Sequence, residues 1–130
     1  MLHTLPHRQL LKEFMSIGPY LREGQCEPGR YFFDCLAHCL NLNVAPELRE
    51  FWGWWLVLEM REDGLTCHSE VGLYSRDGIW LSRQPVQSAA LAAVEASRQH
   101  FMAELQIRLK QCAPDLPAPN CQPEPSPSAA

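Results

Sequence analysis

A chain of 130 residues, 46% hydrophobic and 20% charged, is large enough to bury one core without needing disulfides or metal ions. No apolar run approaches the roughly 20 residues of a membrane-spanning helix, which argues against a membrane protein. The net charge of -4 and the lack of a stripe rich in Lys and Arg argue against direct binding of DNA or RNA. The first residues do not form a secretory signal, so we expect a cytoplasmic protein with reduced cysteine thiols, most of them buried.

The first predicted element is a short amphipathic helix that begins at Pro6. Apolar side chains recur there at helical spacing, at Leu5, Leu10, Leu11, Phe14, Met15 and Ile17. Gly18 followed by Pro19 is a typical stop signal for such a helix. The stretch that follows is rich in glycine and proline, so we expect an ordered loop that carries Tyr20 and Arg22.

A strand is predicted from Arg30 to Leu42, because apolar and polar residues alternate there. The residues expected to face the core are Phe33, Cys35, Ala37 and Cys39. The residues expected on the other face are Phe32, Asp34, Leu36, His38 and Leu40. Pro46 can then open a single helical turn before the second strand begins.

The segment from Pro46 to Met60 places four large aromatic residues in five positions, directly after a charged turn. Successive residues of a strand point to opposite faces. The expected faces are Trp52, Trp54, Leu56, Leu58 and Met60 on one side, and Phe51, Gly53, Trp55, Val57 and Glu59 on the other. A domain of this size easily covers only one of them. Either the strand is hydrophobic on both faces, or some aromatic surface stays exposed next to Arg49, and the residues alone do not decide between these alternatives.

The exposed alternative indicates a protein-binding site, since aromatic residues and arginine dominate the hot spots of protein interfaces. Two segments could build the site jointly. The candidate residues are Pro19, Tyr20 and Arg22 after the first helix, and Arg49, Phe51 and Trp54 at the start of the second strand. Phe51 and Trp54 have opposite parity along the strand. A bulge at Gly53 would turn both side chains to the same face.

Two Asp-Gly pairs, at residues 63–64 and 77–78, predict hairpin turns. They delimit further strands from Leu65 to Tyr74 and from Ile79 to Ser82, so the last three strands form a meander. A long helical pattern follows between Pro85 and Cys112. Its apolar stripe is Ala90, Val94, Phe101, Leu105 and Leu109, with Leu91 and Met102 beside it, and its expected water-facing residues are Glu95, Arg98, Glu104, Arg108 and Lys110.

These elements predict an α+β fold, in which a short N-terminal helix and a long C-terminal helix pack on a four-stranded antiparallel sheet. We expect the domain to span residues 1–113. Residues 114–130 contain six of the eleven prolines and almost nothing apolar to bury. We therefore expect this tail to be extended or disordered.

The residues that most resemble a metal or redox site are Cys35, His38 and Cys39, with Cys67 and His68 on a neighbouring strand. Cys35 and Cys39 are expected on one strand face and His38 on the other, so they could meet at one ion only through a bulge. A small thiol-binding or metal-binding redox protein is thus the alternative function, and a binding module for a hydrophobic small molecule is a third. No phosphate loop, nucleophile elbow or zinc-protease motif occurs, so we predict no enzyme activity, catalytic residue, cofactor or metal.

Three runs of sequence are distinctive: G-P-Y-L-R-E-G-Q-C-E at residues 18–27, Y-F-F-D-C-L-A-H-C-L-N at residues 31–41 and A-P-E-L-R-E-F-W-G-W-W-L-V-L-E at residues 45–59. Together they resemble the Crl family of bacterial sigma factor-binding proteins. The resemblance extends from about residue 5 to residue 110 and is densest between Gly18 and Glu59. Cys112, Cys121 and the proline-rich terminus depart from the family pattern.

The resemblance implies a small cytoplasmic protein with a four-stranded antiparallel sheet, acting as a monomer. It also implies binding to the stationary-phase sigma factor, sigma S, on its second conserved domain. Such binding would promote assembly of sigma S with core RNA polymerase and activate stress-response transcription without reading promoter DNA. The family's contact residues carry over to Tyr20 in G-P-Y, to Arg49 in E-L-R-E, and to Phe51 and Trp54 in F-W-G-W-W, with Pro19 and Arg22 as their neighbours.

Overall fold

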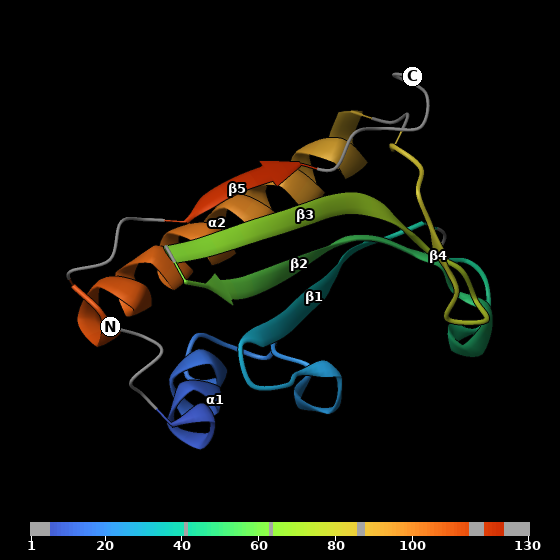
Figure 1. Ribbon diagram of the computed structural model, residues 1–130. Helices are drawn as coiled ribbons and strands as arrows, with labels where there is room; N and C mark the ends of the chain where they lie inside the picture. The colour runs from blue at the N-terminus through green and yellow to red at the C-terminus, as the bar shows by residue number, and fades with distance from the viewer. Residues whose placement is uncertain (1–5, 41, 63, 86–87, 115–118, 124–130) are drawn as a thin grey trace.

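Four antiparallel strands in the order β1-β2-β3-β4 form a curled sheet, and a long helix, α2, crosses one of its faces (Figure 1). The computed structural model describes residues 6–40, 42–62, 64–85, 88–114 and 119–123. Its elements are α1 (His7–Met15), the 3-10 turns η2 (Glu23–Gln25) and η3 (Pro46–Leu48), the strands β1 (Arg30–Cys39), β2 (Phe51–Arg61), β3 (Gly64–Tyr74), β4 (Trp80–Leu81) and β5 (Asn120–Pro123), and α2 (Ser88–Cys112). The α+β prediction is confirmed.

The predicted turns lie close to the positions expected from the sequence. The hairpin between β2 and β3 closes with Arg61 paired to Gly64, and Gly78 adopts a φ of 76° in the turn before β4. A positive φ at Gly78 is the conformation that glycine tolerates best. The predicted single turn at Pro46 is η3. Strand β4 is shorter than expected, because only Trp80 and Leu81 pair with β3.

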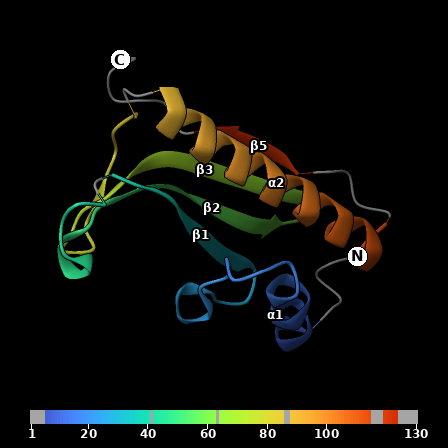
Figure 2. The same cartoon turned by 180° about the vertical axis from the view of Figure 1, so that it is seen from behind.

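Helix α1 closes the core beside β1. Its buried residues are Leu10 and Phe14, and the Phe14 ring meets the rings of Tyr31 and Phe33 edge-on at centroid distances of 5.1 and 5.7 Å. An ion pair at 3.3 Å between Glu13 and Arg108 ties α1 to α2. Figure 2, seen from behind, shows both helices.

The apolar stripe predicted for α2 is confirmed. Ala90, Val94, Phe101, Leu105 and Leu109 are all buried against the sheet. Arg98, which we expected to face water, lies instead against the sheet with its side chain only 16% exposed. Its guanidinium donates to Glu95 at 3.0 Å and to the hydroxyl of the buried Ser69 at 3.5 Å. These two acceptors compensate part of the cost of removing the guanidinium from water.

Strand β2 sends its even-numbered residues into the core. Trp52, Trp54, Leu56 and Leu58 are buried beneath α2. On the other face Val57 is also buried, whereas Phe51 and Trp55 are half-buried. Among the described residues no helix covers that second face, which we call the open face (Figure 1). Of the two alternatives for the aromatic strand, the structure has the one that leaves aromatic surface partly exposed.

The bulge in this sheet lies in β1, not at Gly53. Leu36 pairs with Gly53 and His38 pairs with Trp52, so Ala37 is the extra residue, while the register of β2 with β3 is continuous. The bulge at Gly53 that would have brought Phe51 and Trp54 to one face does not occur. The extra residue reverses the alternation, and His38 comes to the core side and Cys39 to the open face, opposite to the faces predicted for them.

Residues Asn120–Pro123 form β5, which pairs in parallel with β3. We expected this tail to be extended or disordered; the stretch is extended, and its pairing with the sheet is a feature that the composition did not predict. Residues 115–118 and 124–130 lie outside the described residues. Cys67 is held in a disulfide, so the expectation of reduced thiols is wrong for it. The free cysteines of the described residues are Cys26, Cys35, Cys39 and Cys112, each half-buried rather than fully buried.

Gly53 allows β1 and β2 to approach each other closely. A Cβ at this position would lie 2.1 Å from the carbonyl oxygen of Cys35, so Gly53→Ala should force the strands apart. We expect a loss of about 3 kcal/mol in the free energy of unfolding, the upper end of the usual cost of overpacking. Gly24→Ala is the control, because a Cβ there meets nothing within 4 Å. Urea unfolding of both variants checks this, and equal stabilities would contradict it.

Candidate protein-binding surface

The segment after α1 is fixed along the edge of β1. The amide of Arg22 donates to the carbonyl of Phe32 at 2.9 Å, and the amide of Asp34 donates to the carbonyl of Tyr20 at 3.0 Å. Gly18 makes the preceding turn with a φ of 155°, and a Cβ there would lie 2.7 Å from the Tyr20 ring. Tyr20 and Arg22 are therefore held in place by backbone pairing and do not sit on a loose loop.

Asp34 connects three elements on the open face. Its carboxylate accepts a hydrogen bond from the Arg22 guanidinium and, at 2.9 Å, another from the hydroxyl of Tyr74. The Asp34 side chain is 15% exposed, whereas that of Arg22 is 42% exposed. Charge-assisted hydrogen bonds of this kind are stronger than neutral ones. They pin the segment after α1 to β1 and to β3.

Five half-buried aromatic rings lie on the open face: Phe32, Phe51, Trp55, Tyr74 and Trp80. Phe32 and Trp55 stack at a centroid distance of 6.4 Å, and Tyr74 meets Trp80 edge-on at 4.7 Å. The Trp80 indole N–H donates to the Glu70 carboxylate at 2.6 Å. Half-buried aromatic rings, with the polar atoms of Tyr74 and Trp80 paired within the protein, are the kind of surface that protein interfaces use.

Trp80 lies over the backbone of β3. A Cβ at Gly72 would come within 2.4 Å of the Trp80 ring, so a side chain at that position would displace the indole. Phe32, Trp55, Tyr74 and Trp80 were not among the candidates selected from the sequence. The alternation along β2 already put Trp55 on the same face as Phe51, and extending it through the hairpin pairs Phe51 with Tyr74. That signal could have found two of the four.

The predicted site residues do not all come together. Arg22 and Phe51 lie on the open face, where Tyr74 pairs with Phe51 and bonds to Asp34. Trp54 lies on the opposite face of β2.

Trp54 has no exposed surface, and its indole N–H donates to the hydroxyl of Ser97 on α2 at 3.1 Å. It offers no contact area to a partner. The half-buried Tyr20 ring packs on Trp54 and Phe101, at centroid distances of 5.7 and 5.2 Å. Pro19, beside Tyr20, is exposed. Trp54 therefore supports Tyr20 from the core side.

Arg49 organises the segment that leads into β2. Its guanidinium donates to the carbonyls of Val44 at 3.2 Å and Leu42 at 3.3 Å, and its side chain is half-buried. These two bonds fold the segment around the guanidinium. Arg49 therefore sets the conformation of the residues directly before Phe51.

The described residues hold no group of three or more His, Cys, Asp or Glu side chains that could bind a metal ion. Cys35 and His38 now share the core side of β1, while Cys39 lies on the other side. No described helix is long and apolar enough to cross a membrane.

The arrangement defines an α+β protein with a preformed, partly exposed aromatic and arginine surface suited to binding another polypeptide. Residues 1–123 match the family model described as sigma factor-binding transcriptional regulator Crl. The chain is similar to the Sigma factor-binding protein Crl of Vibrio vulnificus strain YJ016, with 40% identity over 105 residues that cover 81% of each chain. It is also similar to the proteins of that name from Vibrio cholerae serotype O1 strain M66-2, with 39% identity over 85% of each chain, and from Photobacterium profundum, with 39% identity over 87% of this chain and 85% of the relative. The chain belongs to the Crl family of sigma factor-binding transcriptional regulators.

The network around Asp34 predicts a specific loss of stability in alkali. Burial, and then the charge and hydrogen bond of Asp34, raise the pKa of Tyr74 above its ordinary value of 10.0. The folded state thus keeps a proton that the unfolded state releases, and stability falls as the pH rises past about 10. Tyr74→Phe removes this contribution, so its free energy of unfolding should fall less steeply with pH than that of the wild type. Urea unfolding across this range tests it, and parallel slopes would contradict it.

Tyr31 shares part of this behaviour, because burial raises its pKa as well. The measurement therefore compares the two proteins and does not use the wild-type slope alone. Tyr31→Phe is the matched control, and its slope should still contain the contribution of Tyr74.

Proposed function

We propose that this protein is a transcription activator that binds the stationary-phase sigma factor, sigma S, on its second conserved domain. It acts in the cytoplasm as a monomer and promotes assembly of sigma S with core RNA polymerase, without reading promoter DNA and without enzymatic activity. Family membership supports the sigma factor as the class of partner. The observation that carries the proposal is the open face with its five half-buried rings, because it presents preformed apolar area next to Arg22.

The proposed contact residues are Pro19, Tyr20, Arg22, Arg49 and Phe51. Pro19 and Arg22 are exposed, and the other three are half-buried, so each retains surface that a partner can reach. Trp54 belongs to the site as the side chain that holds Tyr20 in place. Rings fixed before binding lose little conformational entropy when the partner arrives, which favours affinity.

An activator of this kind works through coupled equilibria. If the protein binds sigma S within the holoenzyme more tightly than free sigma S, then it must tighten holoenzyme assembly by the same factor. A coupling of roughly 1 to 3 kcal/mol corresponds to about 5 to 150-fold. Binding energy alone supplies this effect, so no catalytic group is needed.

The proposed function predicts a preference between sigma factors. Titration calorimetry should show that the protein binds purified sigma S and binds the housekeeping sigma factor far more weakly, at least about tenfold, or 1.4 kcal/mol. Holoenzyme assembly from sigma S and core polymerase should tighten when the protein is added. Equal affinity for both sigma factors, or binding to neither, would refute the proposal.

The proposed function also predicts the effect of removing the Arg49 side chain. Arg49→Ala should weaken sigma S binding by about 2 kcal/mol, because it removes a contact and releases the carbonyls of Leu42 and Val44. Arg8→Ala, at an exposed position of α1, is the control and should bind like the wild type. Unchanged affinity of a folded Arg49→Ala variant would remove Arg49 from the contact set.

A further inference from the structure

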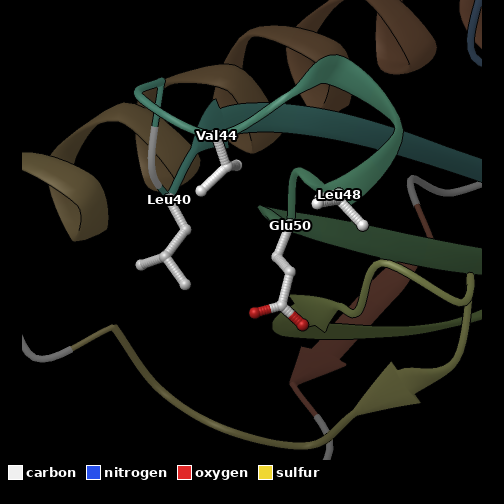
Figure 3. Close-up of a pocket in the computed structure, with 4 residues that line it drawn as sticks. All are labelled: Leu40, Val44, Leu48 and Glu50. Atoms are coloured by element: carbon white, nitrogen blue, oxygen red, sulfur yellow. The ribbon is translucent and has the colours of Figure 1, made fainter.

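A pocket of about 330 Å³ lies beside the segment that Arg49 organises. It is lined by Leu40, Val44, Leu48 and Glu50. Figure 3 shows that the side chains of Leu40 and Glu50 extend in the same direction from the two ends of this segment, with Val44 between them. Three aliphatic residues and one carboxylate therefore line the pocket, with Leu48 at its far side beyond Glu50.

The Glu50 carboxylate in this pocket can accept further hydrogen bonds. Among the described residues the Glu50 carboxylate accepts one hydrogen bond, from the backbone N–H of Arg76 at 3.3 Å. An ionised carboxylate accepts about four. The neighbouring Arg49 guanidinium is already engaged with the carbonyls of Leu42 and Val44. Glu50 is thus a half-buried anion that can still accept hydrogen bonds.

Two apolar side chains that line the pocket are also partly exposed to solvent. Leu40 is 42% exposed and Leu48 is 47% exposed, although both are large apolar side chains. The volume corresponds to roughly ten water molecules at about 30 Å³ each, which is enough room for one long side chain. An occupant must therefore combine an apolar body, for contact with the leucines and Val44, with a donor at its tip.

Lysine and arginine have this construction, an aliphatic stem that packs on apolar surface and a cationic head. We propose that this pocket receives a lysine or arginine side chain of the sigma factor, whose stem packs between Leu40, Val44 and Leu48 and whose head bonds to Glu50. The inference rests on the proposed function and adds the chemistry of one contact to it. The complementary charge of Glu50 fixes the register of the partner on this end of the sheet.

The test uses the full chain and purified sigma S. Glu50→Gln keeps an acceptor for the Arg76 N–H but removes the charge, so binding should weaken about tenfold at low salt. The difference should shrink as salt is added, since screening weakens charge pairs. Glu47→Gln is the matched control, because Glu47 is an exposed carboxylate of η3 outside the pocket lining, and it should bind like the wild type.

Val44→Phe provides a second, independent test of the pocket, since the larger side chain fills the pocket without changing its charge. It should also weaken binding, while thermal unfolding shows that both variants fold. Each Lys and Arg of the second sigma S domain is then changed to Met and measured against the wild type and Glu50→Gln. One sigma S variant should bind the wild-type form of this protein more weakly than unchanged sigma S does. The same sigma S variant should show no further loss of affinity when it is measured against Glu50→Gln, and this result identifies the side chain that occupies the pocket.

The outcomes separate the two proposals. The pocket assignment is overturned if Glu50→Gln and Val44→Phe both bind sigma S with wild-type affinity. It is also overturned if the loss of affinity of every sigma S variant adds to the loss caused by Glu50→Gln. Either result leaves the proposed function standing. Failure of the wild-type chain to bind sigma S would overturn the proposed function and this inference with it.

Discussion

The contact between Trp54 and Phe101 joins α2 to the sheet, and the remaining architecture depends on it. The two rings lie 4.9 Å apart between centroids, and Phe101 continues the cluster to Phe33 at 4.8 Å. A buried indole N–H without an acceptor would be costly, and the hydroxyl of Ser97 supplies one within the apolar stripe of α2. Because α2 is the long helix of the domain, this contact determines which face of the sheet is covered and which face is left for other contacts.

The open face is ordered by contacts within the sheet. Asp34 joins Arg22 to Tyr74, and Glu70 holds the Trp80 indole against β3. Each of these bonds satisfies a polar atom of an aromatic or arginine side chain that would otherwise need water. The rings are therefore fixed in position and still partly exposed, a combination that lowers the entropy cost of binding a partner.

The features that could be predicted from the sequence are those that depend on the local periodicity of apolar residues. The alternation along β2 placed Trp54 with the even-numbered core residues, and the helical spacing of α2 placed Phe101 in the apolar stripe that covers them. The extra residue at Ala37 could not be predicted, because no glycine or proline marks it in the strand pattern. The pairing of β5 with β3 depends on contacts distant in sequence and contradicts the proline-rich composition of the tail. The alternation along β2 put Phe51 on the face opposite Trp54, as the structure has it, whereas the position of Arg22 beside Asp34 could not be predicted because it depends on the pairing of its loop with β1. Trp54 is in the core, since the bulge that would have turned it outward does not occur at Gly53.

The adjacent charged residues Arg49 and Glu50 have different roles at this end of the sheet. The guanidinium turns back to the carbonyls of Leu42 and Val44, two backbone acceptors that lie outside the hydrogen bonds of η3. The carboxylate that follows is left beside Leu40 and Leu48 with a single hydrogen bond among the described residues. A change at the arginine therefore alters the shape of the pocket, whereas a neutral substitution at the glutamate alters only its charge. The structure thus allows the shape and the electrostatics of this end of the sheet to be varied separately.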